Sequence, residues 1–358
     1  MKIKESIISG EWHDDSNAPE NMGFGNTPIS RQFDRLSELV RSSFAPNDSV
    51  DSSDERTERV MKKKTTMKIE EIRKILDGNK IILNGKHQYI RPDDTELEMM
   101  GTTTISGMLP KEWMAAWAGK EAVKALGYFD KIDGEDNAPE KQVLMEKLAE
   151  ISKLTPAQFY SLLKDSKGAH ARKSKEARDF GTEGHNFLEK WIQAKIKNTE
   201  SPKMTGEKWL DSALGKAIEW MEANVSEYIA SEAIVCDLDN NIGGKLDLLA
   251  RLKDEALSVI DFKFAAHIGA DYFVQTAGYI EQLRWLGIDD PKWKRIILRL
   301  PKTETLIEYD KKKRVSVRVP NEFEVCEVRT SLEFDISTFL HLREAGRWWN
   351  YSKQFTNY

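Results

Sequence analysis

Two neighbouring strand-like runs, residues 245–250 and 257–264, each place an aspartate among apolar side chains. A short polar loop joins the runs, and this pattern predicts a β-hairpin. If the loop centres on Asp254, then Asp247 of the first strand lies directly opposite Asp261 of the second. Like charges in this position repel each other, and carboxylates on apolar strands need a partner. A divalent cation is a natural partner, so the hairpin predicts a metal site.

The residues that follow Asp261 add a cation to this site. Alternate residues of a strand share a face, so Lys263 points the same way as Asp261 while Phe262 points to the opposite face. Two acids and a lysine around a hard cation could hydrolyse a phosphodiester. The alternative is an ion pair at the end of a strand. Because Asp247 lies at hairpin spacing, we favour the metal site.

Composition limits the other classes of function. The 358 residues are 40% hydrophobic, enough for a substantial core, and the net charge of -5 gives no global basic field. A groove can still be basic locally. The two cysteines, Cys236 and Cys326, lie far apart, which argues against a zinc finger or an iron–sulfur cluster. No apolar run reaches transmembrane length and no signal-peptide core is present, so we expect a cytoplasmic protein without membrane contact.

The chain is expected to have two parts. Residues 1–66 are rich in Ser, Asn, Asp and Pro, which predicts a largely flexible extension with one amphipathic helix at residues 29–44. From residue 67 to residue 358 the pattern is globular. Helices come first and are followed by a short sheet that has one helix inserted in it. This order predicts an α/β or α+β fold.

Two further segments could contribute to the site. Residues 169–178 and a second stretch, from an N-cap at Thr182 to Lys197, are expected to be separate helices. His185 would then lie in the first turn of the second helix, with Glu189 on the same face. Ahead of Asp247, a glycine pair that includes Gly244 would allow close backbone approach. Taken alone, each segment is more often an ordinary structural feature.

A helix after the Asp261 strand carries Gln275 and Tyr279 on one face. An amide and a phenol can hold a phosphate or a base without adding charge, although ordinary helix decoration would look the same. Arg172 and Lys175 precede the His185 helix and could contact a nucleic-acid backbone. Their alternative role is a solvated surface.

In this order the motifs resemble the PD-(D/E)xK nuclease superfamily, in its RecB-like exonuclease branch, which includes phage and mitochondrial genome-maintenance exonucleases. The resemblance covers about residues 81–309. Leu246 stands where the superfamily name has proline, and aspartate replaces the usual glutamate as the second acid. The matching pairs are Gly181…His185, Gly244…Asp247, Asp261…Lys263 and Gln275…Tyr279.

The resemblance implies a restriction-endonuclease-like core, a short mixed central sheet flanked by helices, and a metal-dependent DNA exonuclease of phage or bacterial replication, recombination or repair. It implies Mg²⁺, with Mn²⁺ as a substitute, and no iron–sulfur cluster. DNA would be bound as a single strand or at a free end, and the extension could bind a replication or recombination protein. A phage-encoded protein would act in the host cytoplasm.

The resemblance also implies roles for individual residues. Asp247, Asp261 and Lys263 would be catalytic, and Gln275, Tyr279, Arg172 and Lys175 would bind DNA. Glu189 and Glu232 would have supporting roles. The metal ligands would be His185, Asp247, Asp261 and the backbone carbonyl of Phe262.

Two other functions remain open on the same fold. One is a structure-specific endonuclease or junction resolvase. The other is a non-catalytic protein that binds DNA ends on a decayed nuclease core. Intact Asp247, Asp261 and Lys263 favour an enzyme, because loss of any one of them would be the simplest sign of decay.

Overall fold

The computed structural model describes residues 66–85, 88–91, 93–94, 98–111, 113–126, 145–310, 312 and 315–355. The chain divides into two compact units, Ser6–Lys64 and Thr65–Tyr358, the second of which also takes in Met1–Glu5. All described residues belong to the larger unit. The amphipathic helix predicted at residues 29–44 lies outside them.

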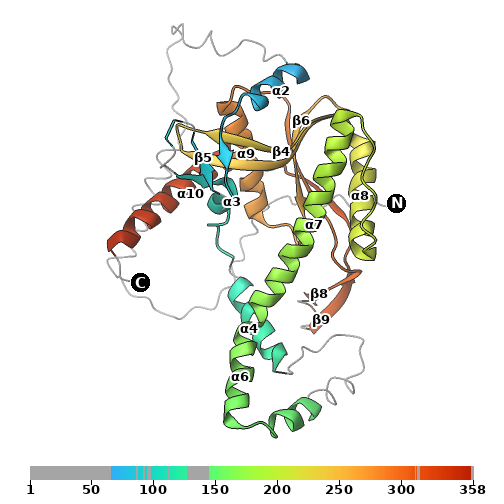
Figure 1. The fold of residues 1–358 in the computed structure, drawn as a ribbon, viewed down its shortest axis with the longest axis vertical. Helices are drawn as coiled ribbons and strands as arrows, with labels where there is room; N and C mark the ends of the chain where they lie inside the picture. Colours follow the sequence, from blue (N-terminus) through green and yellow to red (C-terminus); the bar gives the residue numbers. More distant parts are fainter. Residues whose placement is uncertain are drawn as a thin grey trace. The chain divides into compact units, whose positions relative to one another are not determined.

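A mixed sheet forms the centre of the larger unit (Figure 1). Its main strands are β4 (Val225–Asp237), β5 (Ile242–Leu252), β6 (Leu257–Lys263), β7 (Trp293–Arg299) and β10 (Glu324–Glu327). The strands β4, β5 and β6 pair antiparallel in sequence order. Helix α9 (Ala270–Trp285) then crosses over and brings β7 parallel to β6. The predicted α+β class, a mixed central sheet flanked by helices, is confirmed.

Three short strands extend the sheet beyond β5. They are β1 (Ile82–Leu83), β2 (Tyr89–Ile90) and β3 (Glu98–Gly101), and β3 runs parallel to β5. The sequence Asn84-Gly85 between two apolar runs predicts a β-hairpin with a type I′ turn. The hairpin forms, since β1 and β2 pair antiparallel, but Leu83 pairs with Tyr89, so the loop is longer than the two residues of that turn. The Asn84 side chain closes this loop by accepting a hydrogen bond from the Gln88 N–H, 3.0 Å away.

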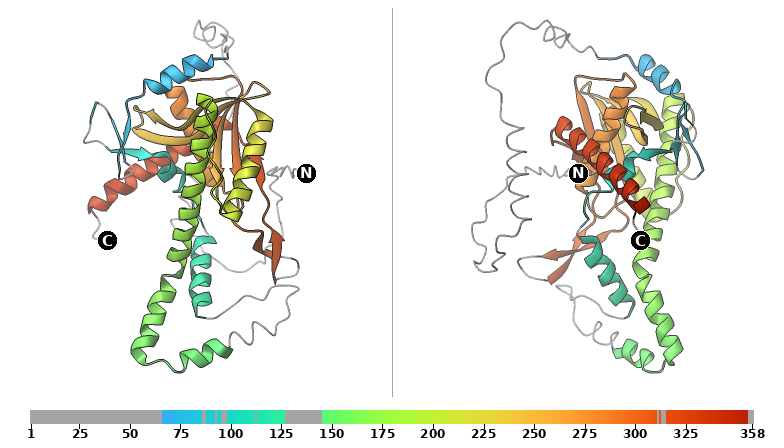
Figure 2. Two further views of the ribbon diagram at one scale, coloured as in Figure 1. Left: turned by 45° about the vertical axis from the view of Figure 1, so that its right-hand side comes forward. Right: turned by 90° about the vertical axis from the view of Figure 1, so that its left-hand side faces the viewer.

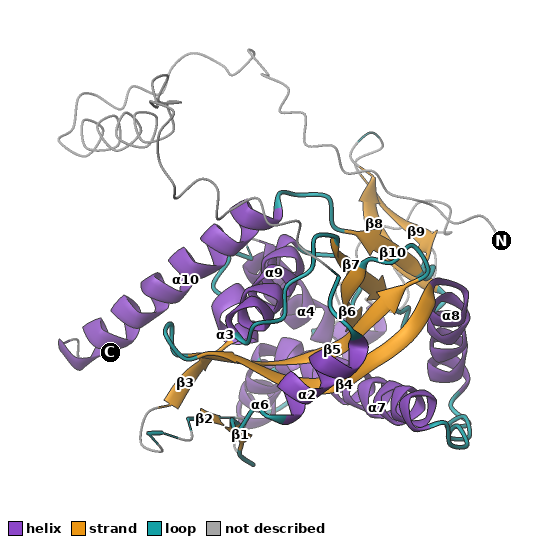
Figure 3. Cartoon of the chain, turned by 90° about the horizontal axis from the view of Figure 1, so that it is seen from above, coloured by secondary structure: helices purple, strands orange, loops and turns teal. Residues whose placement is uncertain are grey.

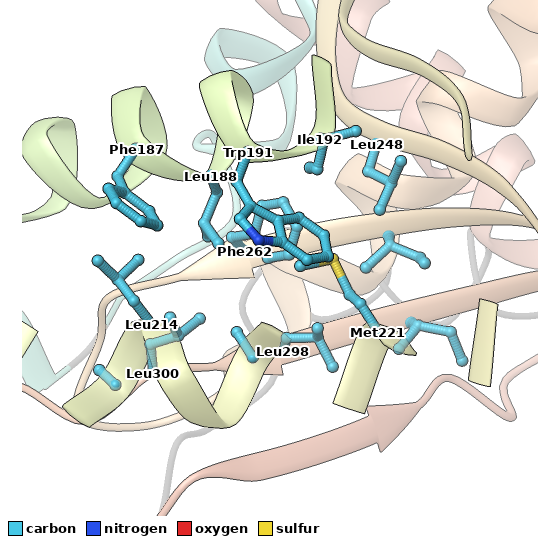
Figure 4. Packing of buried hydrophobic residues seen from close by; sticks show 14 of the residues in the cluster. Phe187, Leu188, Trp191, Ile192, Leu214, Met221, Leu248, Phe262, Leu298 and Leu300 are labelled. Atoms are coloured by element: carbon cyan, nitrogen blue, oxygen red, sulfur yellow. The ribbon is translucent and has the colours of Figure 1, made fainter. Parts of the chain in front are cut away.

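Helices cover both faces of the sheet. On one face, α7 (Ala169–Lys197) and α8 (Lys208–Asn224) pack against apolar side chains of β5, β6 and β7 (Figures 3 and 4). On the other face, α9 and α2 (Ile69–Asp77) cover a second apolar cluster. Consecutive residues of β6 divide between these clusters, since Val259 faces α9 and Ile260 faces α7. Burial on both faces explains why β6 reads as a continuous apolar run.

The two helices predicted at residues 169–178 and Thr182–Lys197 are one helix, α7. Thr182 is therefore not an N-cap, and His185 lies inside a helix of 29 residues instead of in a first turn. Gly184 is accommodated in the middle because Phe264 packs against it, where a Cβ would lie 2.0 Å from the ring. Because the effect of a helix dipole falls off within the first turn, it does not act at His185.

The remaining elements lie around this core. They are α3 (Thr102–Ser106), α4 (Trp113–Ala125), α6 (Pro156–Lys167), α10 (Leu332–Ser352) with its final 3-10 turn η1 (Lys353–Phe355), and the separate hairpin β8 (Thr305–Asp310) with β9 (Val315–Pro320). In Figure 2, α6 and the first turns of α7 extend beyond the sheet. In the described part of the chain, no helix combines the length and apolar character needed to cross a membrane.

Candidate metal centre

The candidate centre lies where β5 changes its pairing partner. Strand β4 occupies one edge of β5 along its whole length, so β3 and β6 share the other edge. Strand β3 pairs at Ile242 and Gly243, and β6 pairs from Leu248 onward. Among the described strands, none pairs with the part of this edge that lies between them. This gap in the sheet contains Asp247.

The hairpin register is the one that the sequence predicts. Leu248 pairs with Ile260, so the next step of the same ladder sets Asp247 opposite Asp261. Here the ladder ends, and Asp247 Oδ2 accepts a hydrogen bond of 2.7 Å from the N–H of Phe262. The carboxylate thus takes the place of a main-chain acceptor. The Phe262 carbonyl lies on the same edge of its strand as the N–H, so it also points towards the gap.

Close packing around the gap explains the glycine pair. A Cβ on Gly244 would lie 2.4 Å from Thr102 Oγ1. Thr102 donates a hydrogen bond to the carbonyl of Gly243 at 3.1 Å, and Gln282 in turn donates to Thr102 at 2.8 Å. Gly244 is therefore required by close approach of α3 and α9, as its position before Asp247 suggests.

Three side chains from three elements converge beside the gap. One ligand atom each of His185 (α7), Glu232 (β4) and Asp247 (β5) lies within 4.8 Å of the other two. His185 Nδ1 is 3.6 Å from Asp247 Oδ1. We call these three residues the triad. Of the described residues, they are the ones that come together with the donor atoms of a metal site.

Glu232 has a more central position than the supporting role that the sequence suggests. The neighbouring pairs of β4 and β5, Ser231 with Leu248 and Ala233 with Leu246, set it opposite Asp247. Its backbone is left-handed, with φ of 53°, inside a strand. This conformation costs a non-glycine residue ~1–2 kcal/mol and is concentrated at functional sites. The Glu232 carboxylate also forms an ion pair with Lys245.

Asp261 lies next to the triad and is bound to Lys263. Its side chain is almost fully buried, and its Oδ2 is 2.7 Å from Lys263 Nζ. The same ammonium donates to Gln275 Oε1 at 3.2 Å and lies 4.8 Å from the ring centre of Tyr272. Lys263 is therefore held from three sides by groups that favour a positive charge.

Gln275 and Tyr279 are buried on α9, behind Asp261. The Gln275 amide nitrogen donates to Asp261 Oδ1 at 3.4 Å and to Tyr279 Oη at 3.0 Å. This network positions the Asp261 carboxylate and the Lys263 ammonium relative to each other. A direct contact of either side chain with DNA stays a prediction.

The three carboxyl groups of the site have pKa values above the ordinary range. Burial raises the pKa of Asp247, although Lys263 opposes the shift. Burial, reinforced by Asp247, raises the pKa of Asp261 to about 6. Burial and the charge of Asp247 likewise raise the pKa of Glu232. The site thus concentrates negative charge that the protein alone does not fully neutralise.

The two basic groups have opposite shifts. Burial, together with the charge of Lys263, lowers the pKa of His185 and favours the neutral ring that a metal ligand requires. Burial lowers the pKa of Lys263, but the charges of Asp261 and Asp247 outweigh burial and the pKa is raised overall. Lys263 is therefore an ammonium ion rather than a base.

The residues present fit a hard divalent cation. The triad offers one imidazole nitrogen and carboxylate oxygens, which suit Mn²⁺ and Mg²⁺. Asp261 Oδ2 is buried, and its partner in the described chain is the Lys263 ammonium, 2.7 Å away. A buried carboxylate oxygen in this state can accept a further positive partner.

Three of the predicted residues lie away from the triad. Glu189, one turn beyond His185, lines a groove of about 300 Å³ with Lys190 and other residues. Arg172 and Lys175 precede His185 on the same helix by 13 and 10 residues, which corresponds to ~20 Å and ~15 Å along the axis. These two residues could reach only a nucleic acid several nucleotides long.

No family model matches the sequence, and no curated protein matches it. The arrangement of these side chains is therefore the basis for proposing a function.

Proposed function

We propose that this protein is a metal-dependent nuclease that hydrolyses phosphodiester bonds in DNA, with the exonuclease activity that the RecB-like motifs imply. The observation that carries the proposal is the convergence of His185, Glu232 and Asp247 beside a third acid, Asp261, that is bound to a lysine. Ordinary structural ion pairs do not require three carboxylates and a neutral imidazole in one place.

Each residue has a distinct role in this proposal. His185, Glu232 and Asp247 would hold the cation, with Asp261 and the Phe262 carbonyl beside them. A bound divalent cation would lower the pKa of a water molecule and neutralise charge on the phosphoryl oxygens. The carboxylates of Glu232, Asp247 and Asp261 outnumber the lysines that pair with them, and this excess of negative charge would attract the cation.

Lys263 would stabilise the negative charge that develops on the phosphate. Its raised pKa and its contacts with Asp261 and Gln275 keep the ammonium charged and in a fixed position. A fixed charge needs no reorganisation when the reaction occurs, which is the usual source of electrostatic catalysis. The Tyr272 ring lies over the same ammonium, with its centre 4.8 Å from Nζ, and favours the positive charge.

The choice of DNA as the substrate and of exonuclease cleavage as the activity comes from the resemblance to the RecB-like branch. DNA with a free end is the substrate that the motifs suggest, and an endonuclease or junction resolvase on the same core is the runner-up. Replication, recombination or repair in a bacterial or phage-infected cell would be its setting.

The test uses the purified full chain with end-labelled single- and double-stranded DNA, linear and circular, in Mg²⁺, Mn²⁺ or EDTA. Glu232→Gln should remove cleavage, while Glu189→Gln serves as a matched control outside the triad. Degradation of linear DNA alone supports an exonuclease, and cutting of circles supports the runner-up. Cleavage that persists in EDTA, or in Glu232→Gln at the wild-type rate, would refute the proposed centre.

A further inference from the structure

The last turns of α10, together with η1, expose a concentrated set of aromatic side chains. Trp348, Trp349, Tyr351 and Phe355 are exposed by 65%, 57%, 60% and 71%. We call these four residues the aromatic end of α10. Exposed large apolar groups that gather in one place usually mark a binding surface, since aromatic side chains are normally at least half-buried.

The aromatic end begins where α10 leaves the body of the protein. Phe339 packs against Gly278 of α9, and Gly346 allows Met108 to approach the helix closely. The last turns of α10 continue past the sheet and its covering helices (Figure 1), and residues 347–351 are exposed. The aromatic residues therefore do not serve the core of the described unit.

The charges on α10 differ between its two ends. After Gly346 and up to Phe355, the charged residues are Arg347 and Lys353, both positive, and Arg347 forms an exposed ion pair of 3.5 Å with Glu344, one turn earlier. Lys353 Nζ lies 5.7 Å from the ring centre of Trp349. At the other end of the helix, Phe334 is also exposed, by 67%, but acids flank it on both sides. Of the two ends of α10, the aromatic end is the one that combines exposed rings with exposed cations.

This surface is connected to the candidate metal centre through a short segment. Met108, which contacts α10 at Gly346, lies three residues before Lys111. Lys111 forms an ion pair of 2.8 Å with Asp271 in the first turn of α9. The next residue, Tyr272, contacts the Lys263 ammonium. The start of the aromatic end is thus linked to the candidate metal centre through Met108, Lys111 and the first turn of α9.

We propose that the aromatic end of α10 binds single-stranded DNA, with bases stacked on its rings and phosphates held by Arg347 and Lys353. Interleaved rings and cations bind single strands without reading their sequence. Paired bases of a duplex do not expose their faces, so the surface should discriminate against duplex DNA. The choice of DNA as ligand rests on the proposed nuclease function, which this surface would extend with a second contact.

The test measures binding of the full chain to a fluorescent oligodeoxynucleotide by anisotropy, in EDTA so that no cleavage occurs. The variant Trp348→Ala/Tyr351→Ala should bind single-stranded DNA about 10-fold more weakly or worse. Phe334→Ala, which removes an equally exposed ring beside acids, should bind as the wild type does. The variant Arg347→Gln/Lys353→Gln should reduce the dependence of log affinity on log salt by about 1.4.

Two results would overturn the proposal. The first is unchanged affinity in Trp348→Ala/Tyr351→Ala, checked with Phe355→Ala as an independent variant and by circular dichroism for folding. The second is a change of oligomeric state in sedimentation with unchanged DNA affinity, which would assign the surface to a second copy of the chain. Because binding is measured without metal, loss of cleavage in Glu232→Gln tests the nuclease separately.

Discussion

The sheet contains two kinds of buried charge. Arg251 and Asp290 form an ion pair of 2.7 Å, and Arg251 also donates to the carbonyls of Glu255 and Met67. Each charge in this pair meets an opposite charge or a fitted hydrogen-bond partner. A second buried pair, in which Arg295 contacts Asp335 at 2.5 Å, follows the same rule.

The candidate metal centre breaks that rule. Its carboxylates, Glu232, Asp247 and Asp261, share Lys245 and Lys263 as their cations, and the pKa values of all three acids are raised, by burial above all. These two structural pairs cancel their charges one for one, whereas the centre keeps an excess of negative charge. The excess is what a binding site for a cation needs, and it should lower the stability of the metal-free protein.

The largest expected difference between the two kinds of charge is in catalysis. Asp247→Asn should lower the rate of DNA cleavage by about 10³-fold or more, because several kcal/mol of electrostatic stabilisation would be lost. Asp290→Asn should leave the rate per folded molecule unchanged. Initial rates on end-labelled DNA, corrected for the folded fraction, measure both. Equal losses in the two variants would erase the distinction.

Stability should respond in the opposite direction. Asp290→Asn leaves Arg251 buried without its counter-charge and should destabilise the protein by ~3–5 kcal/mol. Asp247→Asn relieves repulsion among the carboxylates, and its amide oxygen can still accept the Phe262 N–H. The variant should therefore be as stable as the wild type or up to about 1 kcal/mol more stable. Urea unfolding in EDTA compares them. A strongly destabilised Asp247→Asn would mean that Asp247 is mainly structural.

Metal should stabilise only the protein with an intact centre. At a Mg²⁺ or Mn²⁺ concentration a hundredfold above the dissociation constant, the folded wild type should gain ~2.7 kcal/mol. Asp247→Asn should gain little, and Glu189→Gln should respond like the wild type. Thermal unfolding with increasing metal measures the shift. An equal shift in Asp247→Asn would place the bound ion elsewhere.

A smaller effect is expected at Tyr272, whose ring lies over the Lys263 ammonium without pairing with its charge. Tyr272→Leu removes the ring above the ammonium, an interaction of roughly 1–2 kcal/mol when water is excluded, and should lower kcat about tenfold with little change in KM. Tyr272→Phe keeps the ring and should retain activity. Steady-state kinetics distinguish the two. Loss in both variants would assign the role to the hydroxyl group instead.

The smallest expected effect concerns the backbone at Glu232. Both Glu232→Gly and Glu232→Gln remove the carboxylate, but only glycine adopts φ of 53° without strain. The glycine variant should therefore be more stable than the glutamine variant by ~1 kcal/mol. Their unfolding midpoints in EDTA give the comparison. A less stable glycine variant would show that the strain at this position is negligible.

Local patterns were sufficient to predict the centre of the fold. The hairpin register follows from a loop centred on Asp254, and the structure has that register. The helix predicted after β6 also forms, and it ends beside Gly287, whose φ is 90°. These features depend on residues close in sequence, where strand alternation and turn chemistry decide the outcome.

Features that depend on distant contacts were not predictable. Gly184 is unfavourable inside a helix, but Phe264, which directly follows β6 and lies 80 residues later in the sequence, packs against it. The sequence predicts only a supporting role for Glu232, because its place opposite Asp247 depends on the pairing of β4 with β5, which the residues around Glu232 do not reveal. The sequence does place an acid, Glu232, on the strand before the hairpin. If that strand is paired antiparallel with the Asp247 strand, counting residues along both strands indicates that Glu232 lies close to Asp247.

The two oxygens of Asp247 have different partners, and this limits which insertions and deletions the loop between β5 and β6 can tolerate. Oδ2 accepts the Phe262 N–H, while Oδ1 lies near His185. One carboxylate therefore both ends the strand ladder and faces the cation site. Insertion or deletion of a residue between β5 and β6 would move Asp247 away from both partners at once. This surface loop should therefore be as intolerant of length change as the buried core, unlike most hairpin loops.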